Sequence, residues 1–333
     1  MGARRGRAGV AGMLVVAALA AYAGENTAGR PAGMAAAPVV STPPAPPPAP
    51  SPTPTTTVPV VAEPEPAPAP AYLPAGVHEH HLEIDGIGRR WTTVVPAGRP
   101  ATGVVVVLHG LGGRGADMRP AGFEPLAAVA GVVMAYPDGL GGAWNDGRPG
   151  ADPVVPGPPV DDGRFLRALV DETLTRTGAD ARRVAFVGFS NGAVMASRLA
   201  CDAADRMAAI ALVAGTAGQG FERSCRPSRP MAVMMAAGVN DPVVPYAGGR
   251  LGNWGTKRRG YLAGVEEVFA FWRTQNGCAS TQGAGGETRG TDCRSPVVRY
   301  RVTGGAHEWY RAPRFDTTNV VWEFVLRRFS TAV

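Results

Sequence analysis

Residues 184–193 read VAFVGFSNGA, and this stretch decides how the rest of the chain is interpreted. A short apolar run, typical of a strand buried on both faces, leads into a G-x-S-x-G pattern around Ser190, and small residues follow that suit the start of a helix. A serine on such a strand-to-helix turn sits in strained backbone, and the flanking glycines leave room for close packing. Because the helix N-terminus offers unpaired N–H groups to a developing negative charge, this context predicts that Ser190 is a nucleophile. An ordinary serine in a βα turn is the alternative.

Other apolar runs resemble this one, and helical patterns lie among them. The runs occupy residues 103–108, 132–136, 210–213, 231–236 and 297–302. Helical spacing of apolar residues occurs near 165–174, 194–200, 265–272 and 320–329. Nearer the N-terminus, residues 82–84 and 91–95 lie on either side of an Asp85-Gly86 turn and predict an antiparallel hairpin. The sequence thus predicts an α/β fold with a mainly parallel sheet, helices on both faces and an N-terminal hairpin.

An acid and a histidine follow later apolar runs, so that the chain order is Ser, Asp, His. Asp241 and His307 each lie in a loop directly after such a run, and His307 is the only histidine downstream of Ser190. We therefore predict that Ser190 attacks, that His307 takes and returns the proton, and that Asp241 fixes the imidazole tautomer. The alternative is that Asp241 only forms a turn with its neighbours Asn240 and Pro242.

A second glycine-rich motif ends an earlier strand. Residues 104–113 read VVVVLHGLGG, an apolar run followed by H-G-x-G-G. In enzymes with a G-x-S-x-G elbow, a loop in this position donates one backbone N–H to the oxyanion, and the residue after the nucleophile donates the other. We assign these donors to the backbones of Leu111 and Asn191. His109 precedes the serine, so its expected task is to shape this loop, with service as the catalytic base as the alternative.

The N-terminal part of the chain has the features of an export signal followed by a spacer. Three arginines precede a short apolar core, and an A-x-A cleavage pattern then predicts that residues 1–23 are a signal peptide, with a retained signal anchor as the alternative. Residues 24–76 are dominated by proline and alanine and predict a disordered linker, which either holds the domain away from a surface or has no role. Residues 77–333 are the predicted catalytic domain of a secreted protein, with no stable membrane insertion after signal cleavage.

Four cysteines follow the export signal in two close pairs. Exported proteins form disulfides, and pairing of sequence neighbours, Cys201 with Cys225 and Cys278 with Cys293, is favoured among the three possible connectivities. They form no metal-binding pattern with each other or with histidine, so we expect no metal. Part of the formal net charge of +6 belongs to the export signal, and no dense basic run with interleaved aromatic residues follows. Nucleic acid is therefore not an expected partner, and the sequence predicts no particular oligomeric state.

Together these motifs make residues 77–329 similar to the secreted polyhydroxybutyrate-depolymerase-type and feruloyl esterases, which have the α/β-hydrolase fold. The resemblance rests on HG at 109–110, YPDG at 136–139, WN at 144–145, VDD at 160–162, GFSNG at 188–192, DPVVPY at 241–246 and GGAHEW at 304–309. It implies hydrolysis of carboxylic esters, no cofactor, and a site open to extended substrates. Trp144, Asn145 and Trp309, together with His109, are candidates to bind substrate, with loop or core packing as the alternative.

The expected function is that of a secreted serine esterase acting on polyhydroxyalkanoate, feruloyl or acetyl esters, polymers included. The family pattern is not matched at Gly163-Arg164 or at residues 237–240, and residues 147–159 are rich in proline and glycine, so the identity of the ester stays open. Two other hypotheses remain. One is a peptidase or cell-wall acyltransferase with the same triad, and the other is a non-catalytic surface protein with a hydrolase fold.

Overall fold

The computed structural model describes residues 72–154, 159–311 and 315–331. The predicted signal peptide and most of the predicted linker lie outside these ranges. Leu73 already contacts the folded unit, because its N–H donates to the Arg176 carbonyl oxygen at 2.7 Å and its side chain packs against the core. Regular strand structure begins at Gly76.

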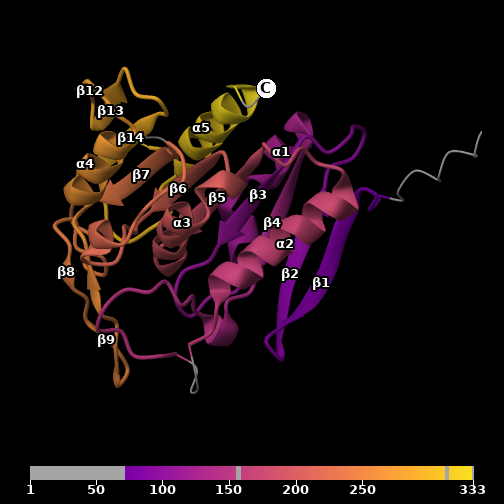
Figure 1. Ribbon diagram of the computed structural model, residues 1–333, viewed down its shortest axis with the longest axis horizontal. Coiled ribbons are helices and arrows are strands. Elements are labelled where there is room, and N and C mark those ends of the chain that lie inside the picture. Colours follow the sequence, from indigo (N-terminus) through magenta and orange to yellow (C-terminus); the bar gives the residue numbers. More distant parts are fainter. Residues whose placement is uncertain (1–71, 155–158, 312–314, 332–333) are drawn as a thin grey trace, which may run out of the picture. The chain divides into compact units, whose positions relative to one another are not determined.

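A ten-stranded sheet organises the described residues (Figure 1). Its middle strands are parallel and follow the order β4-β3-β5-β6-β7-β14, while β1-β2 and β13-β12 add antiparallel strands at the two edges. The strands of this sheet are β1 (Gly76–Ile84), β2 (Ile87–Val95), β3 (Gly103–Leu108), β4 (Val132–Pro137), β5 (Val184–Phe189), β6 (Ala209–Val213), β7 (Ala232–Gly238), β12 (Ser280–Ala284), β13 (Glu287–Thr291) and β14 (Val297–Val302). Two-residue strands form small pairs outside it, namely β8 (Gly249–Arg250) with β11 (Tyr261–Leu262) and β9 (Asn253–Trp254) with β10 (Lys257–Arg258).

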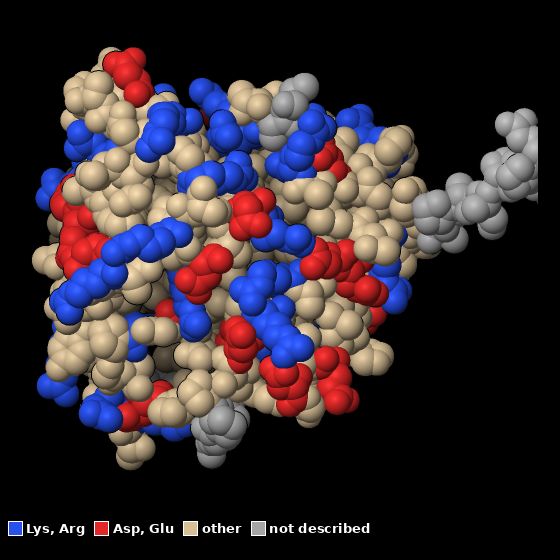
Figure 2. Space-filling view, in the orientation of Figure 1, with Lys and Arg blue, Asp and Glu red and all other residues tan. Residues whose placement is uncertain are grey.

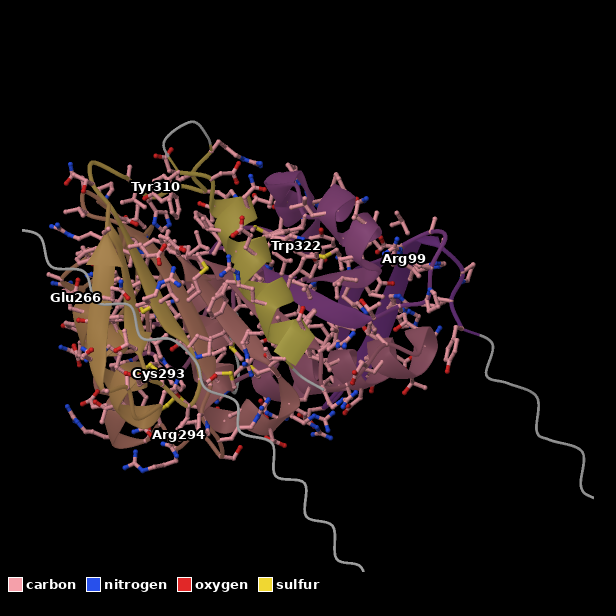
Figure 3. All side chains as sticks on the ribbon, turned by 90° about the horizontal axis from the view of Figure 1, so that it is seen from above. Arg99, Glu266, Cys293, Arg294, Tyr310 and Trp322 are labelled. Carbon is pink, nitrogen blue, oxygen red and sulfur yellow. A yellow bond between two sulfur atoms is a disulfide. The ribbon has the colours of Figure 1, made fainter. Side chains whose placement is uncertain are left out.

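Helices cover both faces of the sheet. One face carries α2 (Asp162–Thr177), α3 (Asn191–Asp202) and α4 (Val265–Gln275), and the other carries α1 (Glu124–Ala130) and α5 (Thr317–Thr331). In Figure 3, α5 lies along the strands, and its Trp322 is buried in the core on that face. Short 3-10 turns occupy Gly115–Ala121, Leu140–Gly142, Ala204–Arg206 and Phe221–Arg223. The middle strands are apolar throughout because helices exclude water from both of their faces. The predicted α/β class is confirmed.

The predicted N-terminal hairpin is present, and a second hairpin was not predicted. Ile84 pairs with Ile87, and the two residues between them, Asp85 and Gly86, have φ values of 52° and 76°, as a tight two-residue turn requires. The unpredicted hairpin is β12–β13. Every residue of β12 is exposed, so this strand has no buried face and no apolar alternation by which the sequence could reveal it.

Each of the two disulfides joins cysteines that are consecutive in the sequence. Cys201 at the end of α3 bonds to Cys225, and Cys278 bonds to Cys293 across the base of the β12–β13 hairpin. Disulfides of this kind fit a protein of an oxidising compartment. In the described ranges, no helix combines the length and the apolar character needed to cross a bilayer.

Candidate active site

Ser190 lies on the sharp turn between β5 and α3. Its φ of 55° is in the left-handed region that residues other than glycine seldom adopt. Close packing around the turn explains the flanking glycines. A Cβ on Gly188 would lie 2.2 Å from the Gly192 carbonyl oxygen, and a Cβ on Gly192 would lie 2.4 Å from the Leu108 carbonyl oxygen. The turn therefore requires both glycines, and it places Ser190 at the carboxyl ends of the parallel strands.

Two other polar side chains meet Ser190 at this edge of the sheet. His307 follows β14 and Asp241 follows β7, so both loops leave the sheet on the same side as the β5–α3 turn. The His307 Nε2 atom lies 3.0 Å from Ser190 Oγ, and the His307 Nδ1 atom lies 2.7 Å from Asp241 Oδ2. The structure thus brings together the three residues of the predicted triad in one hydrogen-bonded chain.

Asp241 has a second task in the same loop. Its Oδ1 atom accepts hydrogen bonds from the backbone N–H groups of Val243 and Val244, each at 2.8 Å, while Oδ2 faces His307. Turn formation and orientation of the imidazole are therefore properties of one carboxylate, not alternatives. Because the turn holds the carboxylate from behind, the imidazole meets an acceptor in a fixed position.

Tyr310 is a residue of the site that the sequence did not reveal. Its hydroxyl donates to the Ala306 carbonyl oxygen at 2.5 Å, next to His307. Burial raises the pKa of Tyr310 to about 12, so the hydroxyl stays a donor. A Cβ on Gly238 would lie 2.3 Å from the Tyr310 hydroxyl oxygen, which shows how closely this ring packs beneath the His307 loop. Tyr310 directly follows the GGAHEW motif, but nothing in the sequence shows what its hydroxyl bonds.

The two predicted oxyanion donors come from the nucleophile elbow and from the loop after β3, where a Cβ on Gly110 would lie 3.3 Å from Ser190 Cβ. Leu111 is in the loop after β3, and Asn191 is the first residue of α3. Among the residues described, no hydrogen bond uses the backbone N–H of Leu111 or Asn191, whereas those of Gly112 and Gly113 donate to Gly142 and Gly110. Two unpaired donors at a strand-to-helix edge are the arrangement that stabilises an oxyanion.

His109 is buried in the loop after β3, with only 1% of its surface exposed. Its Nε2 atom accepts the Gly139 N–H at 2.9 Å, and its Nδ1 atom lies 2.7 Å from the Gly110 carbonyl oxygen, to which it donates. These partners require a neutral ring protonated at Nδ1, and burial lowers the pKa of His109 accordingly. Neither nitrogen is free to accept a proton from Ser190, so His109 shapes the loop.

The lowered pKa of His109 predicts how stability depends on pH. Below its ordinary pKa of 6.5, the unfolded chain binds a proton at this histidine that the folded chain does not bind. The free energy of unfolding should therefore fall as the pH drops below 6.5, by up to about 1.4 kcal/mol per pH unit from this residue. Urea denaturation between pH 5 and pH 8 should give a steeper slope for the parent than for His109→Gln. Burial also lowers the pKa of His80, but His80 is present in both proteins and contributes equally to both slopes. Parallel slopes would therefore contradict the prediction for His109.

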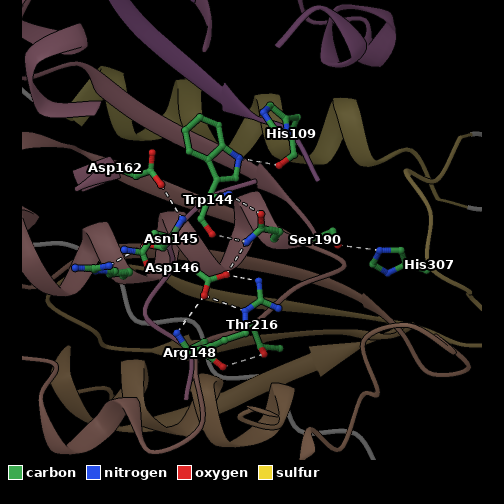
Figure 4. A network of polar contacts seen from close by, with 12 residues as sticks. His109, Trp144, Asn145, Asp146, Arg148, Asp162, Ser190, Thr216 and His307 are labelled. Atoms are coloured by element: carbon green, nitrogen blue, oxygen red, sulfur yellow. Dashed lines mark hydrogen bonds and ion pairs between the residues drawn. The ribbon is translucent and has the colours of Figure 1, made fainter. Parts of the chain in front are cut away.

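The side chain of Asn191 ties the nucleophile elbow to the loop that contains Trp144 and Asp146 (Figure 4). Its Oδ1 atom accepts the Trp144 N–H at 2.8 Å, and its Nδ2 group donates to the Trp144 carbonyl at 3.1 Å and to Asp146 Oδ2 at 2.6 Å. The indole of Trp144 donates to the His109 carbonyl oxygen at 2.9 Å. The amide of Asn191 therefore positions this loop, while its backbone N–H stays unused.

A buried ion pair anchors the same loop from the other side. Arg89 lies on β2 and Asp162 at the start of α2, and the distance from Arg89 Nη2 to Asp162 Oδ1 is 2.5 Å. The two side chains are 1% and 2% exposed. The second oxygen of Asp162 accepts the Asn145 N–H at 2.7 Å. In the sequence, Asp162 stands out only as part of the VDD motif and Arg89 carries no signal, because 73 residues separate the two.

Removing the carboxylate of this pair should destabilise the protein strongly. In Asp162→Ala, Arg89 would keep its charge in a site closed to water, at a cost of about 3–5 kcal/mol in the free energy of unfolding. Asp171→Ala is a matched control on the same helix, because Asp171 pairs with Arg206 at the surface and should contribute less than about 1 kcal/mol. Equal denaturation midpoints for the two variants would contradict this prediction.

A pocket of about 270 Å³ lies on the Leu111 side of the elbow, and its wall includes Asn191, Trp144 and Asn145. Trp144 and Asn145 therefore combine loop packing with a place at the pocket. Trp309 does not line this pocket. Its indole N–H donates to Thr318 at 3.0 Å and its ring packs on Phe123. In the ranges that the structure describes, no group of three or more His, Cys, Asp or Glu side chains is placed to hold a metal ion.

Comparisons with known proteins connect this geometry to esterases. A Nocardia uniformis subsp. tsuyamanensis protein named "Putative esterase NocK" is 32% identical over 235 residues, which are 65% of this chain and 67% of that protein. Feruloyl esterase B of Piromyces equi is 28% identical over 188 residues, or 54% of this chain, and the aligned part is 34% of that protein. No protein-family profile matches the chain.

Solved structures share the fold. The acetyl xylan esterase from Aspergillus awamori superimposes with a TM-score of 0.51 at 15% identity, over 69% of this chain and 94% of that one. At this identity the likeness concerns the α/β-hydrolase fold alone.

Proposed function

This chain belongs to the feruloyl esterase-type family of α/β-hydrolase esterases, and we propose that it cleaves carboxylic esters through an acyl-enzyme formed on Ser190. Ser190 Oγ attacks the ester carbonyl carbon as its proton passes to His307 Nε2. The backbone N–H groups of Leu111 and Asn191 receive the oxyanion. The intermediate then collapses, and the departing alcohol takes the proton from His307.

The second half of the cycle reuses the same groups. A water molecule gives a proton to His307 Nε2 and attacks the acyl carbon, and Ser190 recovers the proton when the acid leaves. Asp241 stays ionised and holds the imidazole with Nδ1 protonated, so that Nε2 is an acceptor at each attack. The observation that supports this proposal most is the hydrogen-bonded chain from Ser190 through His307 to Asp241, with distances of 3.0 and 2.7 Å.

Feruloyl, acetyl and hydroxyalkanoate esters are the proposed substrate classes. The named relatives include feruloyl esterases, and an acetyl xylan esterase has the same fold. We further propose that the protein is secreted, which the two disulfides and the N-terminal apolar segment support.

The proposal is tested by hydrolysis of an ester panel with the chain from Tyr72 onward, which keeps the contacts of Leu73 with Arg176 and with the core. The panel contains p-nitrophenyl acetate, methyl ferulate, acetylated xylan and a hydroxybutyrate oligomer. Hydrolysis of at least one ester at a rate well above that of Ser190→Ala is expected, and the preferred ester identifies the subclass. Failure on every ester would contradict the proposal.

A fluorophosphonate probe separates a serine hydrolase from a non-catalytic surface protein, and the ester panel separates an esterase from a peptidase or acyltransferase. Label on the parent and none on Ser190→Ala is expected for any serine hydrolase, and absence of label on the intact parent would favour a non-catalytic surface protein. A peptidase or acyltransferase would take the label and would cleave at most the activated p-nitrophenyl acetate, leaving methyl ferulate, acetylated xylan and the hydroxybutyrate oligomer intact.

A further inference from the structure

The pocket beside the oxyanion donors has an excess of positive charge. Its wall contains the cationic residues Arg148, Lys257, Arg258 and Arg259 and the carboxylates Asp146, Asp152 and Asp162. Asp162 is neutralised by Arg89, which lies behind it and does not line the pocket. Only two carboxylates therefore remain to balance four cations.

Two of the four cations are paired within the wall. Arg148 donates to Asp146, with an Nε–Oδ1 distance of 2.9 Å, and Arg258 donates to Asp152 Oδ1 from Nη2 at 2.6 Å. Each of these pairs cancels one positive charge against one negative charge. Neither arginine can therefore account for the excess.

Lys257 and Arg259 are the surplus cations. Lys257, the only lysine of the chain, donates to the backbone carbonyls of Pro153, at 2.7 Å, and of Val154. Arg259 donates from Nε to the Gly252 carbonyl oxygen at 2.7 Å. Within the described ranges neither side chain pairs with a carboxylate, and the sequence VPGP at 155–158 contains none. Carbonyl partners orient these side chains without cancelling their charge.

This excess is local to the pocket. On the face shown in Figure 2, Lys and Arg side chains are interspersed with Asp and Glu side chains, so no continuous basic field covers that face. The pocket wall also includes apolar side chains such as Leu111 and Leu140, which keep water away from part of the space. Charges on such a concave, partly apolar wall act on a bound group more strongly than charges on an open surface.

We propose that this pocket selects esters that bear a carboxylate on the part of the substrate that enters it, and that Lys257 and Arg259 determine this specificity. The inference rests on the proposed function. Leu111 and Asn191 also line the pocket. When their N–H groups hold an ester carbonyl, either the acyl part or the alcohol part of the ester therefore lies beside the pocket. A carboxylate in that part of the ester meets two cations that form no ion pair, because Asp152 is already paired with Arg258 and Asp146 with Arg148.

Two matched pairs of esters test a carboxylate on the acyl part and on the alcohol part of the substrate. Mono-p-nitrophenyl glutarate and p-nitrophenyl valerate differ by a carboxylate on the acyl side, and 4-acetoxybenzoate and phenyl acetate differ by one on the alcohol side. In one pair, the ratio of kcat/KM for the anionic ester to that for the neutral ester should fall about tenfold in Lys257→Gln/Arg259→Gln. Raising the ionic strength of the parent should lower the same ratio.

Arg250→Gln is the matched control. Arg250 is exposed on the neighbouring β8 and does not line the pocket, so the ratio should stay at the parent value. Active enzyme whose ratios for both pairs are the same in the parent and the double variant would overturn the inference and leave the proposed function standing.

A binding measurement covers the opposite case, in which no ester is hydrolysed and the proposed function fails. Calorimetric titration of monomethyl glutarate at low ionic strength should then give an affinity at least fivefold weaker for the double variant than for the parent and for Arg250→Gln. Equal affinities, or no binding to the parent, would overturn the inference.

Discussion

Ser190→Ala is expected to lower kcat for ester hydrolysis by about 10⁶-fold, to the residual rate that binding and the oxyanion donors alone can supply. The reason is chemical, because alanine has no atom that can form the acyl-enzyme. Leu111 and Asn191 would still bind the carbonyl oxygen, so KM should change far less than kcat. Steady-state kinetics on the preferred ester, with active-site titration of the parent, measure this loss.

Stability should hardly change in the same variant. The hydrogen bond described for the Ser190 hydroxyl is to His307, and the unusual φ of 55° is no harder for alanine than for serine. Ser197→Ala is the matched control, a buried serine of α3 whose hydroxyl has no partner among the described residues, and it should retain parental kcat. If Ser190→Ala kept more than about one hundredth of parental activity, the acyl-enzyme on Ser190 would be refuted.

Asp241→Asn is expected to lower kcat by about 10⁴-fold while the fold stays intact. The asparagine oxygen can still accept from Val243 and Val244, so the turn should persist. Its amide group, however, would present a donor to His307 Nδ1. The imidazole would then carry its proton on Nε2, where it can no longer accept the proton of Ser190.

The measurement that checks this is kcat together with the urea denaturation midpoint. Asp316→Asn is the control, because Asp316 also accepts a backbone N–H, that of Asn319 at 3.0 Å, but directly precedes α5 and forms no hydrogen bond with a triad residue. A loss of kcat in Asp241→Asn with an unchanged midpoint separates orientation of the imidazole from turn formation. Parental kcat in Asp241→Asn would show that the carboxylate serves only the turn.

Local signals made the fold and the proposed triad predictable from the sequence. Strands buried on both faces are continuous apolar runs, and the strand–turn–helix context of Ser190 marks one end of the sheet. Asp241 and His307 follow later runs of the same kind, and parallel strands end at the same edge. A topological rule therefore brings together residues up to 117 positions apart.

Features without a local signal could not be predicted. Strand β12 is exposed throughout, and neither β12 nor β13 has an alternation of apolar residues. The amide of Asn191 bonds a loop 47 residues earlier, and the Tyr310 hydroxyl holds the loop of His307. No periodicity or motif spacing encodes such contacts, because they depend on which loops the sheet brings into reach.

The class of the fold, the position of the elbow and the candidate triad could be predicted from patterns along the chain, because backbone conformation, burial and strand order impose such patterns. Three-dimensional packing was needed to choose between the two roles considered for His109 and to show how charge is distributed around the pocket. Both ring nitrogens of His109 meet backbone groups, and Arg89 neutralises Asp162 from a distant strand. The positive charges of Lys257 and Arg259 are unbalanced because each carboxylate of the pocket wall is paired with another arginine. Hydrogen bonds and charges are balanced in space, and that balance is set when distant segments pack together.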